Sequence, residues 1–65
     1  MIDLKYISQR RLELGITLQT AAEVLGFKNA SNYLKYESGE YKFRADMLPK
    51  LAELLNCEMQ NFFND

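Results

Sequence analysis

The sequence predicts an all-α fold, a compact bundle of five helices that includes a helix-turn-helix. Apolar residues recur at spacings of three and four along the chain, no segment has the alternation of a strand, and glycines separate the helical segments. The 65 residues suffice for one domain, 1–65, with one small core and no deep catalytic cleft.

The first helix is expected from about Leu4 to Leu14, with Asp3 as its N-cap. Leu4, Ile7, Arg11 and Leu14 fall on one stripe of this helix, the stripe that faces the core. An arginine on an inward stripe requires a partner of opposite charge.

Two short helices then flank a turn. Thr17 can cap a helix over residues 18–25, and Gly26 supplies the left-handed residue that ends it. After a turn of about four residues, a second helix carries Tyr33 and Tyr36 inward and ends before Gly39. This is the layout of a helix-turn-helix.

Helical spacing continues to the end of the chain. After a loop over residues 39–44, the run from Met47 to Asn56 predicts a helix with Leu48, Leu51, Leu54 and Leu55 inward. Pro49 falls in its first turn if Asp46 is the cap, and otherwise bends it. A last short helix over residues 58–63 would bring Met59 and Phe62 onto the core.

The polar turn and the first half of the second helix are rich in side chains that can contact base edges. An asparagine can bond bidentately to adenine, a lysine can reach guanine, and an apolar side chain such as Leu34 can touch a thymine methyl group. The candidates for base contacts are Asn29, Ala30, Ser31, Asn32 and Lys35. Asn29 or Ser31 would alternatively cap the helix, and Lys35 would alternatively be a solvated surface lysine.

Charge is distributed unevenly along the chain. The net charge is −1, which is low for a DNA-binding domain, but residues 28–44 carry four basic and two acidic side chains, a local charge of +2. The acidic excess lies in the C-terminal third. We therefore expect weaker non-specific affinity for DNA than a basic protein would show.

Several segments together resemble the Cro and lambda-repressor-like helix-turn-helix family, also called the XRE family. They are Arg11-Leu12 before Gly15-Ile16-Thr17, then Ala22, Leu25-Gly26, Tyr36 to Gly39, and Leu51-Ala52 with Leu54-Leu55. The resemblance implies a five-helix bundle of lambda-repressor-like type, as in phage repressor domains. It also implies binding of double-stranded DNA as a homodimer, with the third helix in the major groove.

The resemblance implies roles for further residues. Arg11 would pair with Glu37, which ties the first helix to the end of the recognition helix. Phosphate contacts would flank that helix and come from Thr17, Gln19, Lys28, Tyr41, Lys42 and Arg44. The chain departs from the family pattern in two places. Leu18 stands where glutamine is usual, and the segment from Gly26 to Gly39 is one residue longer than the commonest spacing.

Large apolar residues near the C-terminus suggest an interface. Met59, Phe62 and Phe63 exceed what one short helix can bury, so we expect a dimer interface there, with core packing as the alternative for Phe62. For Tyr41 and Phe43 the alternative is packing against the helix-turn-helix, and for Phe43 packing is the favoured role. Cys57 is expected to be a small buried hydrophobe.

The composition also excludes several functions. The chain has no histidine and one cysteine, so we expect no disulfide, no metal, no cofactor and no enzymatic activity. No signal peptide or long apolar run is present, which leads us to expect a cytoplasmic protein without a membrane partner.

The function expected is transcription regulation, by a phage-type or mobile-element repressor on a palindromic operator. The alternative is a helix-turn-helix protein-interaction module, namely an antitoxin, antirepressor or adaptor. The local charge of +2 and the polar recognition helix favour DNA, because an interaction module would not need them.

Overall fold

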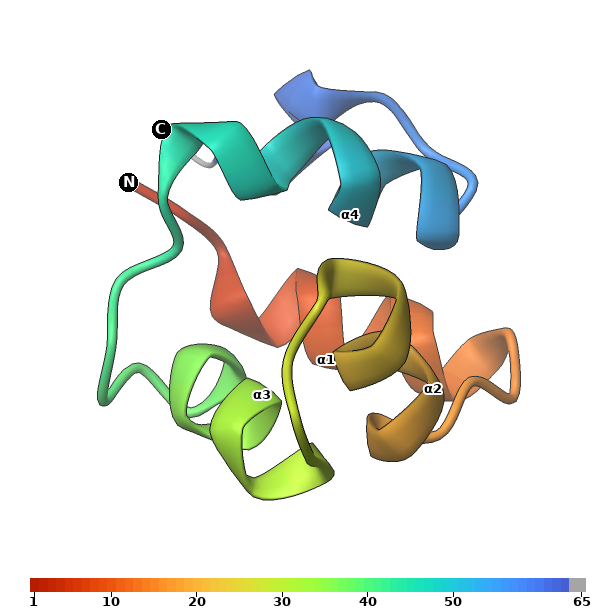
Figure 1. The fold of residues 1–65 in the computed structure, drawn as a ribbon. Coiled ribbons are helices and arrows are strands. Elements are labelled where there is room, and N and C mark those ends of the chain that lie inside the picture. Colours follow the sequence, from red (N-terminus) through yellow and green to blue (C-terminus); the bar gives the residue numbers. More distant parts are fainter. Residues whose placement is uncertain (64–65) are drawn as a thin grey trace.

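The computed structural model describes residues 1–63, which fold into four α-helices and two 3-10 turns (Figure 1). In chain order they are α1 (Leu4–Glu13), α2 (Leu18–Leu25), α3 (Ala30–Glu37), η1 (Ala45–Met47), α4 (Leu48–Leu54) and η2 (Met59–Phe62). Residues 1–63 contain no β-strand, apart from one isolated antiparallel bridge between Ile2 and Phe63. The prediction of an all-helical fold is therefore confirmed.

The prediction of five helices is wrong, because the last segment is a 3-10 turn. Its hydrogen bonds span three residues, from the amide of Asn61 to the carbonyl of Glu58 at 2.9 Å and from that of Phe63 to Gln60 at 3.3 Å. Four residues are too few to sustain an α-helix, whose first turn is costly to form. Phe62 lies in the core as expected, but Met59 lies largely outside it.

Two helix boundaries also differ from expectation. Leu14 lies past the end of α1 and is exposed, although it was expected on the inward stripe, because the chain turns away at Gly15. Asp46 does not cap α4, since it lies inside η1, and the helix starts two residues later. Pro49 falls in the first turn of α4, where its missing N–H costs little.

Local side-chain bonds explain where the first three helices begin. Asp3, Thr17 and Asn29 each stand one position before a helix and accept a hydrogen bond from the amide three residues ahead. The bonds measure 3.0, 3.1 and 3.0 Å, from the amides of Tyr6, Thr20 and Asn32. Each cap satisfies a donor that the helix itself leaves free.

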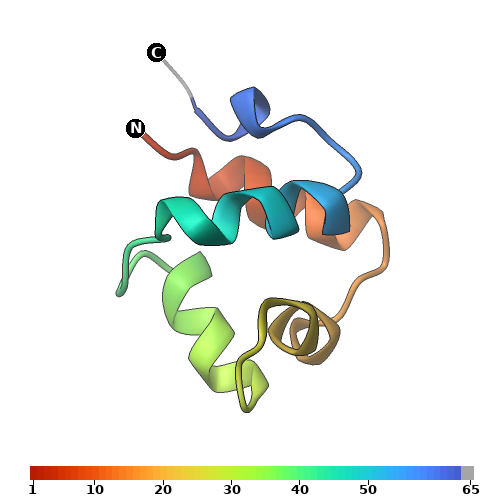
Figure 2. The same cartoon turned by 45° about the horizontal axis from the view of Figure 1, so that its top comes forward.

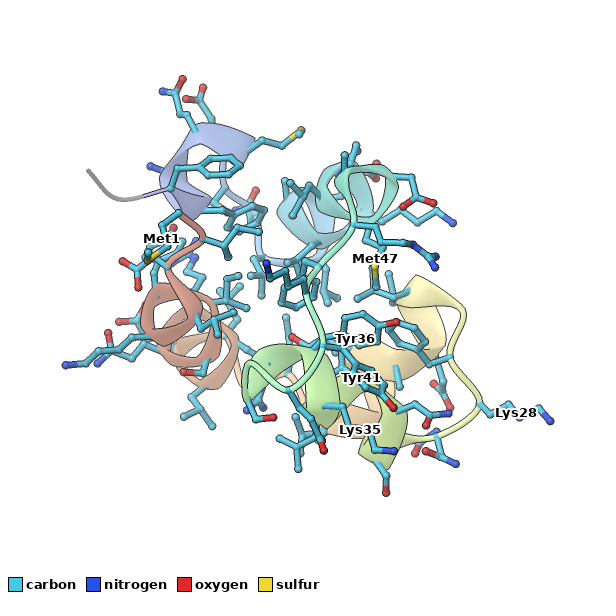
Figure 3. All side chains as sticks on the ribbon, turned by 90° about the vertical axis from the view of Figure 1, so that its left-hand side faces the viewer. Met1, Lys28, Lys35, Tyr36, Tyr41 and Met47 are labelled. Carbon is cyan, nitrogen blue, oxygen red and sulfur yellow. The ribbon has the colours of Figure 1, made fainter. Side chains whose placement is uncertain are left out.

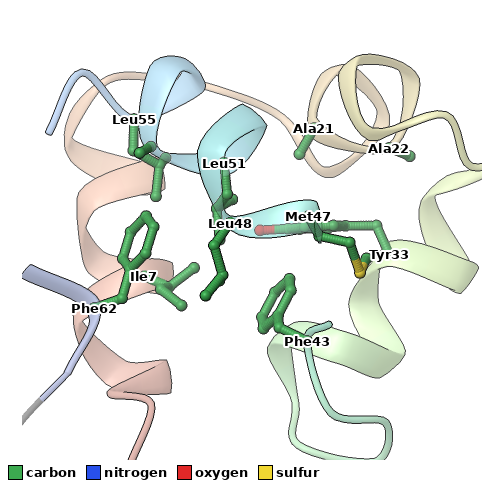
Figure 4. Close-up of a cluster of buried hydrophobic side chains, with 11 residues drawn as sticks. Ile7, Ala21, Ala22, Tyr33, Phe43, Met47, Leu48, Leu51, Leu55 and Phe62 are labelled. Carbon is green, nitrogen blue, oxygen red and sulfur yellow. The ribbon is translucent and has the colours of Figure 1, made fainter. Parts of the chain in front are cut away.

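The core lies between the helices and draws on every element (Figure 4). Ile7 of α1, Tyr33 of α3 and Phe62 of η2 are fully buried. They pack with Ala21, Ala22, Phe43, Met47, Leu48, Leu51, Ala52 and Leu55. The burial of Phe43 confirms its expected packing role.

Hydrogen bonds join α1 to the end of α4 and to the last turn. Arg10 donates from Nε to the carbonyl of Leu55 at 2.9 Å and from Nη2 to that of Asn56 at 3.3 Å, which satisfies carbonyls at the end of α4. At the N-terminal end, the amide of Asp3 donates to the carbonyl of Phe62 at 2.6 Å. The segment before α1 and the last turn therefore lie together, on the side of the molecule away from α2 and α3 (Figures 1 and 2).

Candidate nucleic-acid interface

The helices α2 and α3 pack against each other and are joined by a turn over residues 26–29, the length expected from the sequence. Gly26 has a φ of +85°, in the left-handed region, and its amide donates to the carbonyl of Glu23 at 3.2 Å. The amide of Phe27 donates to the carbonyl of Ala22 at 2.8 Å. These two bonds form a Schellman motif, which ends α2 and sends the chain directly into α3.

The two sides of α3 differ sharply in burial. Tyr33 and Glu37, four residues apart on one stripe, are buried, and Tyr36 beside them is half-buried. On the opposite side Ser31 is exposed and Leu34 is 44% exposed. Among the other candidates for base contacts, Ala30, Asn32 and Lys35 are half-buried.

Asn29 caps α3, which is one of the two roles expected for it from the sequence. Its Oδ1 accepts from the amide of Asn32 at 3.0 Å, so α3 starts at Ala30. A bidentate bond to adenine needs Oδ1 as an acceptor as well as the side-chain N–H groups. Because Oδ1 is engaged in the cap, the side-chain NH2 of Asn29 is the better placed group for a contact outside the chain.

A buried ion pair fixes the inner side of α3. Arg11 donates from Nε to Glu37 Oε1 and Oε2 at 3.2 and 3.0 Å, and from Nη2 to Oε1 at 2.9 Å. The side chains are 10% and 5% exposed, so the pair is shielded from water. This is the pairing that the family resemblance implied, and it raises the pKa of the Arg11 guanidinium.

Arg11 also reaches the segment before α2. Its Nη1 donates to the carbonyl of Ile16 at 2.9 Å, so one guanidinium joins α1, the entry to α2 and the end of α3. Next to it, the buried hydroxyl of Tyr33 makes no hydrogen bond within residues 1–63. Burial raises the pKa of this phenol above its ordinary value, and the neighbouring Glu37 carboxylate raises it further.

The candidates for phosphate contacts at the start of α2 already have partners within the chain. Thr17 caps the helix and also donates from its hydroxyl to the Thr20 hydroxyl at 3.1 Å. Gln19 donates from Nε2 to Glu23 at 3.2 Å. Leu18, which replaces the usual glutamine, packs against the core, so this position serves the fold.

The other candidates for phosphate contacts lie in the turn and in the loop after α3. Lys28 and Lys42 are exposed, and neither forms an ion pair within residues 1–63. Arg44 donates to Asp46 at 3.3 Å, in a pair whose side chains are 67% and 74% exposed. Such exposed pairs are weak and screened by salt, so Arg44 can exchange this partner at little cost.

Aromatic side chains connect the turn, α3 and the loop. Phe27 stacks on Tyr36 with ring centroids 5.0 Å apart, and Tyr36 meets Tyr41 edge-on at 5.6 Å. Lys35 lies beside Tyr41 on the outer side of this row (Figure 3). The sequence reasoning did not single out Phe27, although an apolar residue directly after a helix-ending glycine commonly packs back on the helix before it, and this would have marked Phe27 as partly buried.

The expected dimer surface is only partly available. Phe62 is 0% exposed and packs against Tyr6, with ring centroids 6.3 Å apart, so in this conformation it has no surface to offer a second copy. Core packing, the alternative given for Phe62, is the role it has. Met59 and Phe63 are 40% and 49% exposed and leave part of the apolar surface uncovered.

Comparison with protein families agrees with this geometry. The chain matches the model of a helix-turn-helix family over residues 7–62, which includes α2, α3 and the residues of the Arg11–Glu37 pair. It belongs to the XRE family of Cro and lambda-repressor-like helix-turn-helix proteins. No curated protein and no solved structure matches the chain.

Membership defines the general activity. An XRE-type chain is a DNA-binding regulator, and the family is not typically enzymatic. Within residues 1–63, no three His, Cys, Asp or Glu side chains gather where they could hold a metal ion. None of the helices in this part of the chain is long and apolar enough to span a membrane.

Proposed function

We propose that this XRE-family chain is a sequence-specific repressor of the phage or mobile-element type. It binds a palindromic operator as a homodimer, with α3 of each copy in the major groove. The observation that carries the proposal is the contrast between the two sides of α3. The inner side is fixed by the buried Arg11–Glu37 pair, whereas the outer side presents Ser31, Leu34 and Lys35.

The outer side of α3 has the chemistry for contacts with bases. Ser31 can donate to or accept from a base edge, Lys35 can donate to guanine, and Leu34 can contact a thymine methyl group. Asn32 and Ala30 lie at the margins of this side, and the side-chain NH2 of Asn29 adds a donor at the helix start. Because the inner side of α3 is held by the buried ion pair, the helix presents these groups in one register, which specific contacts require.

Phosphate contacts would fix that register from both sides of α3. Lys28 in the turn and Lys42 in the loop are the exposed cations, with Arg44 available after it releases Asp46. Thr17 and Gln19 stand at the start of α2, where free amides also favour an anion. The family resemblance also assigned Tyr41 to phosphate, but its ring lies beside Lys35, and we give it a different role below.

The dimer would use the exposed apolar residues Met59 and Phe63 near the chain ends. Two copies joined by a two-fold axis would place their recognition helices about 34 Å apart, one turn of DNA. This spacing makes a palindromic operator the matching target.

A protein-interaction module is the second candidate, and one observation favours it. Leu34 of α3 and Val24 of α2 are each 44% exposed on the helix-turn-helix, and the net charge of −1 adds no general attraction to DNA. An antitoxin, antirepressor or adaptor would cover these apolar side chains with another protein.

Selection from random duplex DNA at about 100 mM salt separates the two, because affinity depends on salt. Enrichment of a palindrome with half-sites near one helical turn apart supports the repressor. The control is Lys35→Ala, a variant of the outer side of α3, which should remain helical and lose the wild-type preference at the base pair that Lys35 contacts. A folded wild-type chain that enriches no sequence would refute the repressor and favour the interaction module.

A further inference from the structure

Lys35 of α3 and Tyr41 of the following loop are in contact at two points. The Nζ atom of Lys35 lies 5.5 Å from the centroid of the Tyr41 ring (Figure 3), within the ~6 Å range of a cation–π interaction. The amide of Tyr41 also donates to the carbonyl of Lys35 at 3.0 Å. Side chain and main chain therefore both attach Tyr41 to this lysine.

The Tyr41 ring is itself held, although it is 49% exposed. Tyr36 contacts it edge-on, at 5.6 Å between centroids and an interplanar angle of 75°. Gly39 turns the loop back over the end of α3 with a φ of +92°, a conformation that L side chains rarely adopt. The ring thus occupies a defined place beside the outer side of α3.

Lys35 keeps its full charge in this arrangement. No carboxylate within residues 1–63 forms an ion pair with it, and an aromatic ring attracts an ammonium group without neutralising it. The N–H donors of the ammonium group that point away from the ring remain available for an acceptor. A free lysine, by contrast, loses side-chain entropy when a ligand fixes it.

We propose that Tyr41 is a positioning residue for base recognition. Its ring, and not its hydroxyl, holds the ammonium group of Lys35 at the outer side of α3 before DNA arrives, so that Lys35 enters the groove preset toward a guanine edge. This inference rests on the proposed DNA-binding function, and it replaces the phosphate contact expected of Tyr41. This positioning should strengthen binding to the operator more than binding to random DNA, because many lysine conformers can reach a phosphate in random DNA.

Two substitutions separate the ring from the hydroxyl. Tyr41→Phe keeps the ring, and Tyr41→Leu removes the ring but keeps an apolar side chain. Each is made alone and together with Lys35→Ala, and affinity is measured at one salt concentration for the selected operator and for a random duplex. Tyr41→Phe should bind the operator as the wild type does. Tyr41→Leu should bind it about two- to fivefold more weakly, the size of an exposed cation–π contact.

In the Lys35→Ala background, Tyr41→Leu should cause no further loss. A second readout needs no DNA. The side-chain methylene protons of Lys35 should show upfield ring-current shifts by NMR in the wild type and in Tyr41→Phe, and lose them in Tyr41→Leu. Unfolding midpoints of all variants check that the fold is intact, and Tyr41→Met replaces Tyr41→Leu if the latter unfolds.

Each contrary result has a distinct meaning. Equal losses for Tyr41→Phe and Tyr41→Leu would assign the effect to the hydroxyl and overturn the inference. The inference would also be overturned if Tyr41→Leu weakened operator binding as much in the Lys35→Ala background as alone, or if Lys35 showed no ring-current shift in the free wild type. The proposed DNA-binding function would remain in both cases. A wild-type chain that shows the shift but prefers no duplex would overturn the proposed function, and this inference with it.

Discussion

Replacing Glu37 by leucine should destabilise the protein more than any surface change. The substitution removes the three hydrogen bonds that Arg11 donates to the carboxylate, and it leaves a guanidinium that is 10% exposed without a counter-charge. Breaking a buried pair by removing one partner costs about 3 to 5 kcal/mol. The remaining bond from Arg11 to Ile16 places the expected loss near the lower value.

This loss is large for a chain of 65 residues. At roughly 0.05 to 0.15 kcal/mol per residue, such a chain has a free energy of unfolding of about 3 to 10 kcal/mol. Glu37→Leu should therefore be unfolded or only marginally folded. The measurement is urea denaturation followed by far-ultraviolet circular dichroism, with the midpoint and the slope fitted separately.

A second substitution distinguishes the charge from the packing. Combining Arg11→Met with Glu37→Leu removes both charges and keeps apolar volume, and it should restore stability to within about 1 kcal/mol of the wild type. Arg44→Ala, which breaks the exposed pair with Asp46, is the control and should cost less than about 1 kcal/mol. A loss below about 1 kcal/mol for Glu37→Leu, or a double variant no better than the single one, would refute the role assigned to the pair.

The remaining predictions concern one buried phenol, one cap and the DNA contacts. Because the pKa of Tyr33 is raised in the folded chain, unfolding above pH about 10 releases its proton, and the free energy of unfolding should fall there by up to about 1.4 kcal/mol per pH unit. Tyr33→Phe should remove this part of the fall and should cost no stability at pH 7, since the hydroxyl makes no hydrogen bond within residues 1–63. Denaturation of both proteins at a series of pH values is the test. Asn29→Ala should lower stability by about 1 kcal/mol through loss of the α3 cap, whereas Asn29→Asp should keep most of it, and equal losses in denaturation would contradict the capping role. Lys42→Ala should weaken binding to operator and random DNA alike and reduce the slope of affinity against salt by about 1. Asn32→Ala should reduce the binding free energy by about 1 to 3 kcal/mol, mainly for the operator. Titrations of both duplexes at several salt concentrations test this, and equal behaviour of the two variants would contradict the division of roles.

Local signals allowed much of the fold to be predicted. The caps Asp3 and Thr17 and the stop at Gly26 lie within four residues of what they control, and the ends of α1 and α2 fall within one residue of expectation. The inward stripe predicted only that Arg11 needs a counter-charge, whereas the choice of Glu37, 26 residues away, came from the family resemblance. The caps and the stop, by contrast, depend on chemistry that neighbouring residues already specify.

Long-range features were not accessible in this way. The bond from Arg10 to the carbonyl of Leu55 joins residues 45 apart in the sequence, and no periodicity indicates it. The exposure of Met59 and Phe63 depends on how the last turn meets α1. In the candidate site, the contact between Lys35 and Tyr41 depends on the path of the loop.

The contact between Asp3 and the last turn has a consequence for local opening. Asp3 caps α1 with its side chain and binds Phe62 with its amide, so one residue serves both the first helix and the last turn. Release of the last turn would remove one of the two restraints on Asp3 and loosen the start of α1. Because the amide of Tyr6 donates to the side chain of Asp3, its hydrogen exchange should report on the state of the last turn.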